Sequence, residues 1–176
     1  FYDELKAYVT GHIRSGNTYT SNSAAGMIKE IMAHPKEENL EVTFRMDSGY
    51  IDEDILETIE KLNCKYVIKG KAYPTLVTQA IDVYLIFGVD EENQETAELV
   101  TSLNTWKKDR RFVISRVVRD EQDRTQLSFL EGKEYTYSFF VTNTDLSSEE
   151  VVDSYQKRDN SENYIKEAKY DMAVGR

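Results

Sequence analysis

The segment from residue 40 to residue 70 alternates between strand-forming and helix-forming sequence. The β-branched and aromatic run LEVTFRM (40–46) predicts a buried strand, and KYVIKG (65–70) predicts a second one. Between them, apolar residues at helical spacing predict a helix over 53–62, and Asp52 is placed to cap it. Such alternation is typical of a mixed or parallel sheet covered by helices. The chain is therefore predicted to be an α/β protein.

The second half of the chain is rich in strand-forming sequence. DVYLIFGV (82–89), RRFVISRVVRD and YTYSFFVTN each predict a strand, so the region from about 82 to 142 resembles an extra β layer. A final helix is expected to begin near Ser147 or Ser148, with Asp145 as a cap or turn residue before it. The 176 residues suit one domain, 1–176, without internal repeats.

The composition excludes several classes of protein. The net charge is 22 − 32 = −10, which argues against an ordinary nucleic-acid-binding module. No apolar run approaches the ~20 residues that a membrane span needs. The one cysteine, Cys64, cannot form an internal disulfide, which fits a reducing cytosol. Two histidines and one cysteine, far apart in the sequence, form no zinc-type cluster.

Asp47 directly follows the predicted strand 40–46. In open α/β sheets, ligands bind beyond the carboxyl ends of the strands, and a carboxylate there suits a metal ligand or a general base. Asp-Ser-Gly is also a common turn composition, so a turn or helix-cap aspartate is the structural alternative. Arg45, two residues earlier, is a candidate partner for a carboxylate. The spacing alone favours the turn.

The segment from 151 to 176 is polar and charged, and its pattern is helical. At 100° per residue, Tyr155, Arg158, Glu162 and Lys169 fall in one stripe about 60° wide. The stripe borders the apolar side of the helix, so it can line a cleft whose floor is the core. There, a carboxylate suits a cation, and arginine and lysine suit phosphates. A surface helix laced with ion pairs four residues apart is the alternative.

The segment NTWKKDRRF (104–112) is the densest positive cluster. Trp106 would stack on an unpaired base if it were exposed, or pack in the core. The basic side chains around it are candidates for binding phosphates: Lys107, Lys108, Arg110 and Arg111.

Four blocks of the chain resemble DDE transposases of bacterial insertion sequences. Tyr155, Arg158, Glu162 and Lys169 match the Y–R–E–K signature of these enzymes, Y-x2-R-x3-E-x6-K. FRMDSGY resembles the block around the family's second catalytic aspartate. IRSGNTYTSNSAAGMIKEI resembles the segment that precedes it, and YSFFVTN resembles the strand before the signature helix. The blocks follow the family's order and span residues 13 to 169.

This resemblance implies an RNase-H-like mixed sheet with flanking helices, in which a strand-rich insertion, about 82–142, precedes the C-terminal catalytic helix. It implies metal-dependent DNA strand cleavage and strand transfer, with two Mg²⁺ or Mn²⁺ ions. Asp47 and Glu162 are the implied catalytic and metal-binding carboxylates. The implied DNA-binding residues are Tyr155, Arg158 and Lys169. Implied partners are transposon ends and target DNA, with a homodimer as a further option, in a bacterial cytoplasm near the nucleoid.

The family's first aspartate has no counterpart at the expected place. Asp3 is the only aspartate before Asp47, and it lies too close to the segment that begins at residue 13. The chain is therefore expected to be a piece that starts after that aspartate, without the opening strands of the sheet, and to be inactive alone. Two other interpretations stay open: a non-catalytic α/β remnant of a degenerate element, and a stand-alone two-metal nuclease.

Overall fold

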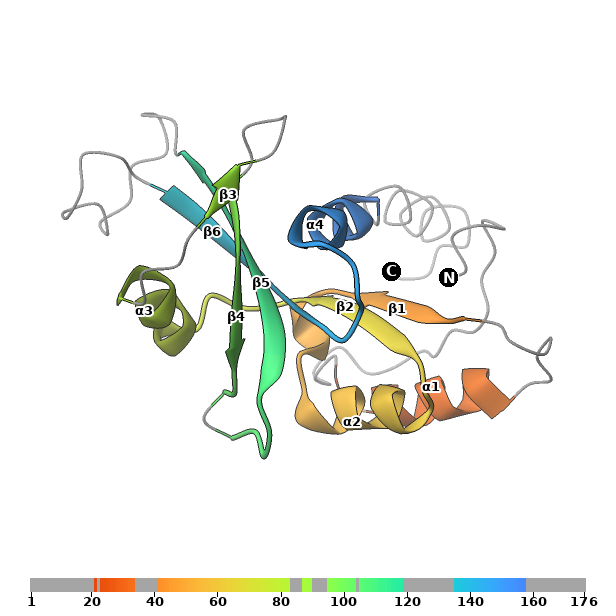
Figure 1. Cartoon of the computed structure of the whole chain (residues 1–176). Helices are drawn as coiled ribbons and strands as arrows, with labels where there is room; N and C mark the ends of the chain where they lie inside the picture. Colours follow the sequence, from red (N-terminus) through yellow and green to blue (C-terminus); the bar gives the residue numbers. More distant parts are fainter. Residues whose placement is uncertain are drawn as a thin grey trace, which may run out of the picture.

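A six-stranded mixed sheet forms the centre of the protein (Figure 1). The computed structural model describes residues 21, 23–33, 41–82, 87–89, 95–103, 105–118 and 135–157. The strands are β1 (Thr43–Met46), β2 (Lys65–Lys69), β3 (Gly88–Val89), β4 (Glu95–Thr101), β5 (Arg110–Val118) and β6 (Tyr135–Thr142). Their order across the sheet is β1-β2-β6-β5-β4-β3. β1 and β2 are parallel, and each other neighbouring pair is antiparallel.

Helices cover both faces of this sheet. The helices of the described part are α1 (Ala24–Ala33), η1 (Ser48–Tyr50, a 3₁₀ turn), α2 (Glu53–Lys61), α3 (Pro74–Asp82) and α4 (Ser148–Gln156). Figure 1 shows α1 and α2 on one side of β1 and β2, and α4 on the other. The predicted α/β class, with a mixed sheet and flanking helices, is therefore confirmed.

Side-chain alternation along the strands divides the core in two. Tyr66 and Ile68 of β2 point into the larger cluster, which α1, α2 and α3 cover. Val67, between them, points to the opposite face and packs with Val151 and Val152 of α4. Three α4 side chains join this smaller cluster: Val151, Val152 and Tyr155. They lie at helical spacing, so one face of α4 covers the cluster. The position of α4 over the end of β2 follows from this packing.

Local sequence signals place the helix starts correctly. The Asp52 carboxylate accepts a hydrogen bond from the Asp54 backbone N–H (3.0 Å), so it caps α2 as predicted. The Ser147 hydroxyl accepts from the Glu150 N–H (3.2 Å), and the Glu150 carboxylate accepts from the Ser147 N–H (2.8 Å). This reciprocal capping box makes Ser147 the cap of α4. Asp145 is instead an exposed partner of Lys65, at 3.2 Å.

The strand-rich region corrects two expectations. The strand predicted over 82–89 is wrong at its start, because Asp82 ends α3; the described part of this segment holds only the short β3. β3 to β6 also continue the sheet of β1 and β2, so they are not an extra layer. The interpretation of the region from about 82 to 142 as an insertion stays a prediction.

The sequence did not reveal β4, because its acidic residues resemble a break in the pattern. In the structure, Glu95 forms an ion pair with Arg116 of β5, and Glu98 forms one with Arg111. These are contacts between neighbouring strands of one sheet. The acidic residues therefore support strand pairing here.

A buried charged group, the Arg110 cluster, joins α2 to the start of β5. The Arg110 side chain is 3% exposed, and its guanidinium bonds the Glu60 carboxylate (3.0 Å) and contacts Glu53 (3.4 Å). The Tyr66 hydroxyl donates to the same Glu60 carboxylate (2.9 Å). Burial alone would raise the pKa of Glu60, but hydrogen bonds from Arg110, Lys108 and Tyr66 outweigh it and hold that pKa below its ordinary value of 4.5. Burial beside Glu60 raises the pKa of Tyr66.

Protonation of Glu60 is expected to destabilise the protein in acid. Because the folded pKa lies below the unfolded value of 4.5, the stabilisation is complete above about pH 4.5 and is lost as the pH falls through the lower, folded pKa. The free energy of unfolding, measured in urea across this pH range, should fall less steeply with decreasing pH for Glu60→Gln than for the wild type. Glu149→Gln removes an exposed carboxyl, and its free energy of unfolding should depend on pH as that of the wild type does. Equal slopes for all three proteins would contradict this role for Glu60.

Candidate functional site

Asp47 lies at the carboxyl end of β1 and begins the turn η1. Its backbone is extended (φ −81°, ψ 177°), and its Oδ1 accepts a hydrogen bond from the Gly49 N–H at 2.8 Å. The side chain is half-buried. The turn role predicted for Asp47 is therefore confirmed. It does not compete with a ligand role, because the turn bond engages Oδ1 and fixes the carboxylate at the strand end.

The final helix approaches the same strand. Arg45 of β1 donates from Nη1 to the backbone carbonyl of Ser154 in α4, at 3.0 Å across 109 residues of sequence. Asp47 follows Arg45 by two residues, so alternation along the extended chain directs both side chains toward the α4 face. This bond lies in the last turn of α4, where carbonyl oxygens favour a cation, and the expectation that Arg45 pairs with a carboxylate stays a prediction.

Tyr155 anchors this end of α4 to the sheet. It is 8% exposed, and its ring packs on Phe140 of β6 with the ring centroids 5.2 Å apart. Lys69 Nζ, at the end of β2, lies 5.9 Å from the centre of the Tyr155 ring. Between positioning a DNA strand and positioning the helix, this burial favours the helix.

Three predicted site residues, Arg158, Glu162 and Lys169, lie outside the described residues. The structure thus brings together the strand of Asp47 and the helix of Tyr155, the first residue of the Y–R–E–K spacing. The convergence of Asp47 with Glu162 stays a prediction.

Trp106 is half-buried and packs against the larger core cluster, which favours the packing interpretation over base stacking. Its ring stacks on Phe112 (centroids 5.8 Å apart, planes at 17°), and the Arg110 guanidinium lies 5.0 Å from its centre. Phe112 itself is fully buried. These contacts give the ring a structural role in packing against β5.

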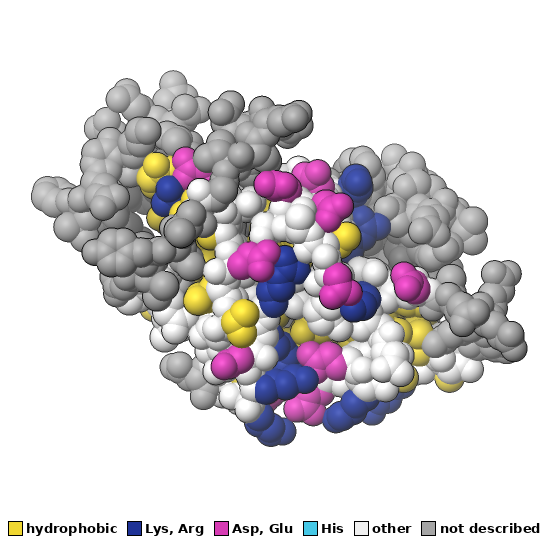
Figure 2. All heavy atoms as spheres, viewed as in Figure 1, with side chains coloured by type: hydrophobic (Ala, Val, Ile, Leu, Met, Phe, Trp, Pro, Cys, Tyr) yellow, Lys and Arg dark blue, Asp and Glu magenta, His cyan; other side chains and the backbone are white. Residues whose placement is uncertain are grey.

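The cations of the basic cluster around Trp106 are ion-paired in the structure, and a phosphate role for them stays a prediction. Each cation has an acidic partner: Lys107 with Glu57 (3.9 Å), Lys108 with Glu60, Arg110 with Glu60 and Glu53, and Arg111 with Glu98. On the face drawn in Figure 2, lysine and arginine side chains are interspersed with aspartate and glutamate. The cluster binds α2 and β4 to β5.

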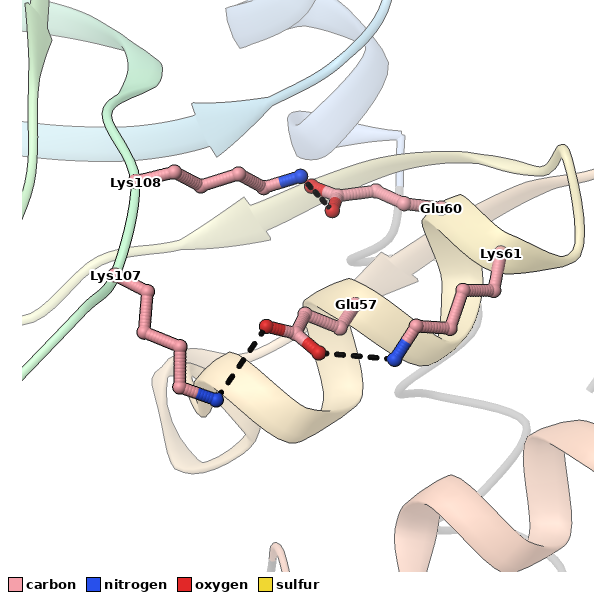
Figure 3. Close-up of a pocket in the computed structure, with 5 residues that line it drawn as sticks. All are labelled: Glu57, Glu60, Lys61, Lys107 and Lys108. Carbon is pink, nitrogen blue, oxygen red and sulfur yellow. Dashed lines mark hydrogen bonds and ion pairs between the residues drawn. The ribbon is translucent and has the colours of Figure 1, made fainter.

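Two hollows on the described surface lie away from Asp47 and Tyr155. Figure 3 shows the first, in which Lys107 and Lys108 point across to the acidic side chains of α2. Its lining charges pair with one another. The second, of about 420 Å³, lies between the start of α2 and Trp106, with Asp52 and Glu53 in its wall. Asp52 caps α2 and Glu53 binds Arg110, so both acids already have structural roles.

A family model described as Transposase DDE domain group 1 matches residues 1–176. The chain belongs to this family. No curated protein matches the sequence significantly. Within the described residues, no helix is long and apolar enough to cross a membrane. The DDE transposase family fits an RNase-H-like core, and its members are transposases that act on DNA.

DDE transposase domains generally use divalent metals, so we ask whether the residues at the β1 end suit such ions. Asp47 does: a fixed carboxylate at a strand end is the oxygen ligand that Mg²⁺ and Mn²⁺ prefer. Among the described residues, no three histidine, cysteine or acidic side chains lie close enough to hold a metal ion. Asp47 is therefore one candidate ligand, and the described part of the chain holds no complete cation site.

The bond from Arg45 to α4 is expected to contribute measurably to stability. Arg45→Met keeps much of the apolar stem but removes the charged donor to the Ser154 carbonyl, which should lower the free energy of unfolding by about 1.5 kcal/mol. Urea denaturation monitors the change. Lys157→Met removes an exposed cation just after α4 and serves as the control. If both variants unfolded at the wild-type midpoint, Arg45 would not hold this DDE transposase helix against β1.

Proposed function

We propose that the chain is the catalytic core of a transposase of the Y–R–E–K branch, encoded by a bacterial insertion sequence. Its reaction is metal-dependent cleavage of DNA at transposon ends, followed by joining of the freed 3′-hydroxyl to target DNA. The observation that carries the proposal is the family match over residues 1–176, together with Asp47 at a strand end beside α4. α4 leads directly into the segment that carries Glu162.

The proposed roles follow from the chemistry of each side chain. Asp47 and Glu162 hold Mg²⁺ or Mn²⁺, which supply activated water and stabilise the oxygens of an in-line displacement. Arg158 and Lys169 bind phosphates, Arg158 with the two-pronged geometry that only guanidinium offers. Tyr155 sets the position of the helix through its contact with Phe140.

The location of positive charge supports this division of roles. The cations of β5 and the preceding turn are ion-paired with acids, so they cannot be the principal DNA contacts. We therefore assign phosphate binding to the α4 side of the sheet. We infer cytoplasmic action near the nucleoid, and a homodimer that acts on two transposon ends.

The test is a strand-cleavage assay with a version of the protein that includes a strand carrying the family's first aspartate. Labelled DNA is expected to be cut with Mg²⁺ or Mn²⁺ and left intact with EDTA. Joining of the cut end to a second duplex identifies a transposase, whereas cutting without joining identifies a two-metal nuclease. Binding of DNA without cleavage at any metal concentration identifies a non-catalytic remnant and overturns the proposal.

A further inference from the structure

Strand register places a lysine beside the candidate catalytic aspartate. Met46 of β1 pairs with Ile68 of β2 in parallel register, so Asp47 and Lys69 are the next residues along neighbouring strands. Such strands lie about 4.8 Å apart. Gly70 fixes the end of β2, since a Cβ there would lie 3.0 Å from that of Phe139. Both side chains therefore emerge at the same edge of the sheet.

Lys69 and Asp47 also share a face. Val67, two residues before Lys69, packs in the cluster beneath α4, and Lys69 itself lies over the ring of Tyr155 in α4. Arg45, two residues before Asp47, bonds the backbone of α4. Since alternate residues of a strand point the same way, the two ends form one surface with opposite charges side by side.

The ammonium of Lys69 differs from the cations on β5. The Lys69 side chain is exposed, and within the described part of the chain its ammonium makes no ion pair. Its contact with the Tyr155 ring orients the group but leaves its outer hydrogens for another acceptor. By contrast, Arg110 and Arg111 each bind carboxylates.

We propose that Lys69 binds a phosphate of the DNA strand held at Asp47. This inference rests on the proposed function, because DNA is the anion that a transposase core brings to this edge. Lysine suits the task, since a compact cation on a flexible stem follows a phosphate that shifts during the reaction. In a chain with net charge −10, a cation beside the acidic site also offsets the repulsion between carboxylates and phosphates.

The test measures binding of a short fluorescent DNA duplex by anisotropy, in EDTA, over a series of salt concentrations. Lys69→Met is expected to reduce the slope of log K against log salt by about 1, the loss of one phosphate contact. Lys69→Arg should keep the wild-type slope. Lys61→Met is the matched control, because Lys61 is an exposed cation on α2, across the sheet from α4.

The outcomes separate this proposal from the proposed function. If the wild type does not bind DNA at low salt, the role of Lys69 is overturned, while the proposed function is decided separately by the strand-cleavage assay. If the wild type binds and Lys69→Met keeps its slope, only the role of Lys69 is overturned. A lower urea midpoint for Lys69→Met with an unchanged slope would assign Lys69 to helix packing and would also overturn it.

A second measurement works without any substitution at Lys69. Acetylation of the wild-type protein, read by mass spectrometry, should be slower at Lys69 when the duplex is bound and unchanged at Lys71, an exposed lysine beyond the strand. Equal acetylation of Lys69 with and without DNA contradicts the contact.

Discussion

Asp47→Asn is expected to reduce metal-dependent DNA strand cleavage by about 1000-fold, in a version of the protein that carries the family's first aspartate. Asparagine keeps an Oδ1 that can accept from the Gly49 N–H, so the turn after β1 is retained. What it loses is the negative charge that a divalent cation needs. The substitution therefore keeps the fold but removes the charge that the chemistry needs. Cleavage of labelled DNA in Mg²⁺ measures the loss of activity.

Asp145→Asn is the matched control for this experiment. Asp145 is also a carboxylate that follows a strand, but it is exposed and pairs with Lys65 at the opposite end of β2. Its substitution should leave cleavage unchanged. Glu162→Gln should match Asp47→Asn, because both carboxylates are proposed to hold the same ions. Full activity of Asp47→Asn would remove Asp47 from the site, whatever the behaviour of Glu162.

Arg110→Met is expected to lower the free energy of unfolding by about 4 kcal/mol. The substitution keeps an apolar stem against Trp106 but removes the cation between Glu53 and Glu60. Both carboxylates are largely buried, with 13% and 19% exposed, so Glu53 would lose its ion-pair partner and Glu60 would keep only Lys108 as a cation. Urea denaturation at pH 7 measures the loss.

Two companion variants test the cause of this destabilisation. Adding Glu53→Gln and Glu60→Gln to Arg110→Met should restore much of the stability, since the buried negative charges disappear together. Lys61→Met, which removes an exposed cation from the same helix, should leave the unfolding midpoint unchanged. If Arg110→Met unfolded at the midpoint of Lys61→Met, the cluster would not be what joins α2 to β5.

Local patterns in the sequence identified most of the elements. β1, α2 and β2 were predictable because apolar spacing and the Asp52 cap act within a few residues of one another. The Ser147 cap of α4 was predictable for the same reason. β4 was not, since its strand character depends on arginines that lie 13 or more residues away on β5.

For the site, the sequence determined the candidate residues and the structure decided their surroundings. Asp47 could be placed at a strand end from the run before it, and the family match covers the whole chain. The ion pairs of Lys107, Lys108 and Arg110 could not be predicted, because their partners on α2 are some 50 residues distant in sequence. Lys69 could not be predicted as a site residue, since only strand register sets it beside Asp47.

What the sequence alone determined about this protein is short-range: most of the strands and helices, the caps of α2 and α4, and the spacing of acidic and basic residues along them. These depend on hydrogen bonds and side-chain periods that span three or four residues. Only the tertiary structure decided which charges neutralise one another and which side chains share an edge. Those outcomes depend on contacts such as Arg45 to Ser154, 109 residues apart, which exist only once the sheet and α4 pack together.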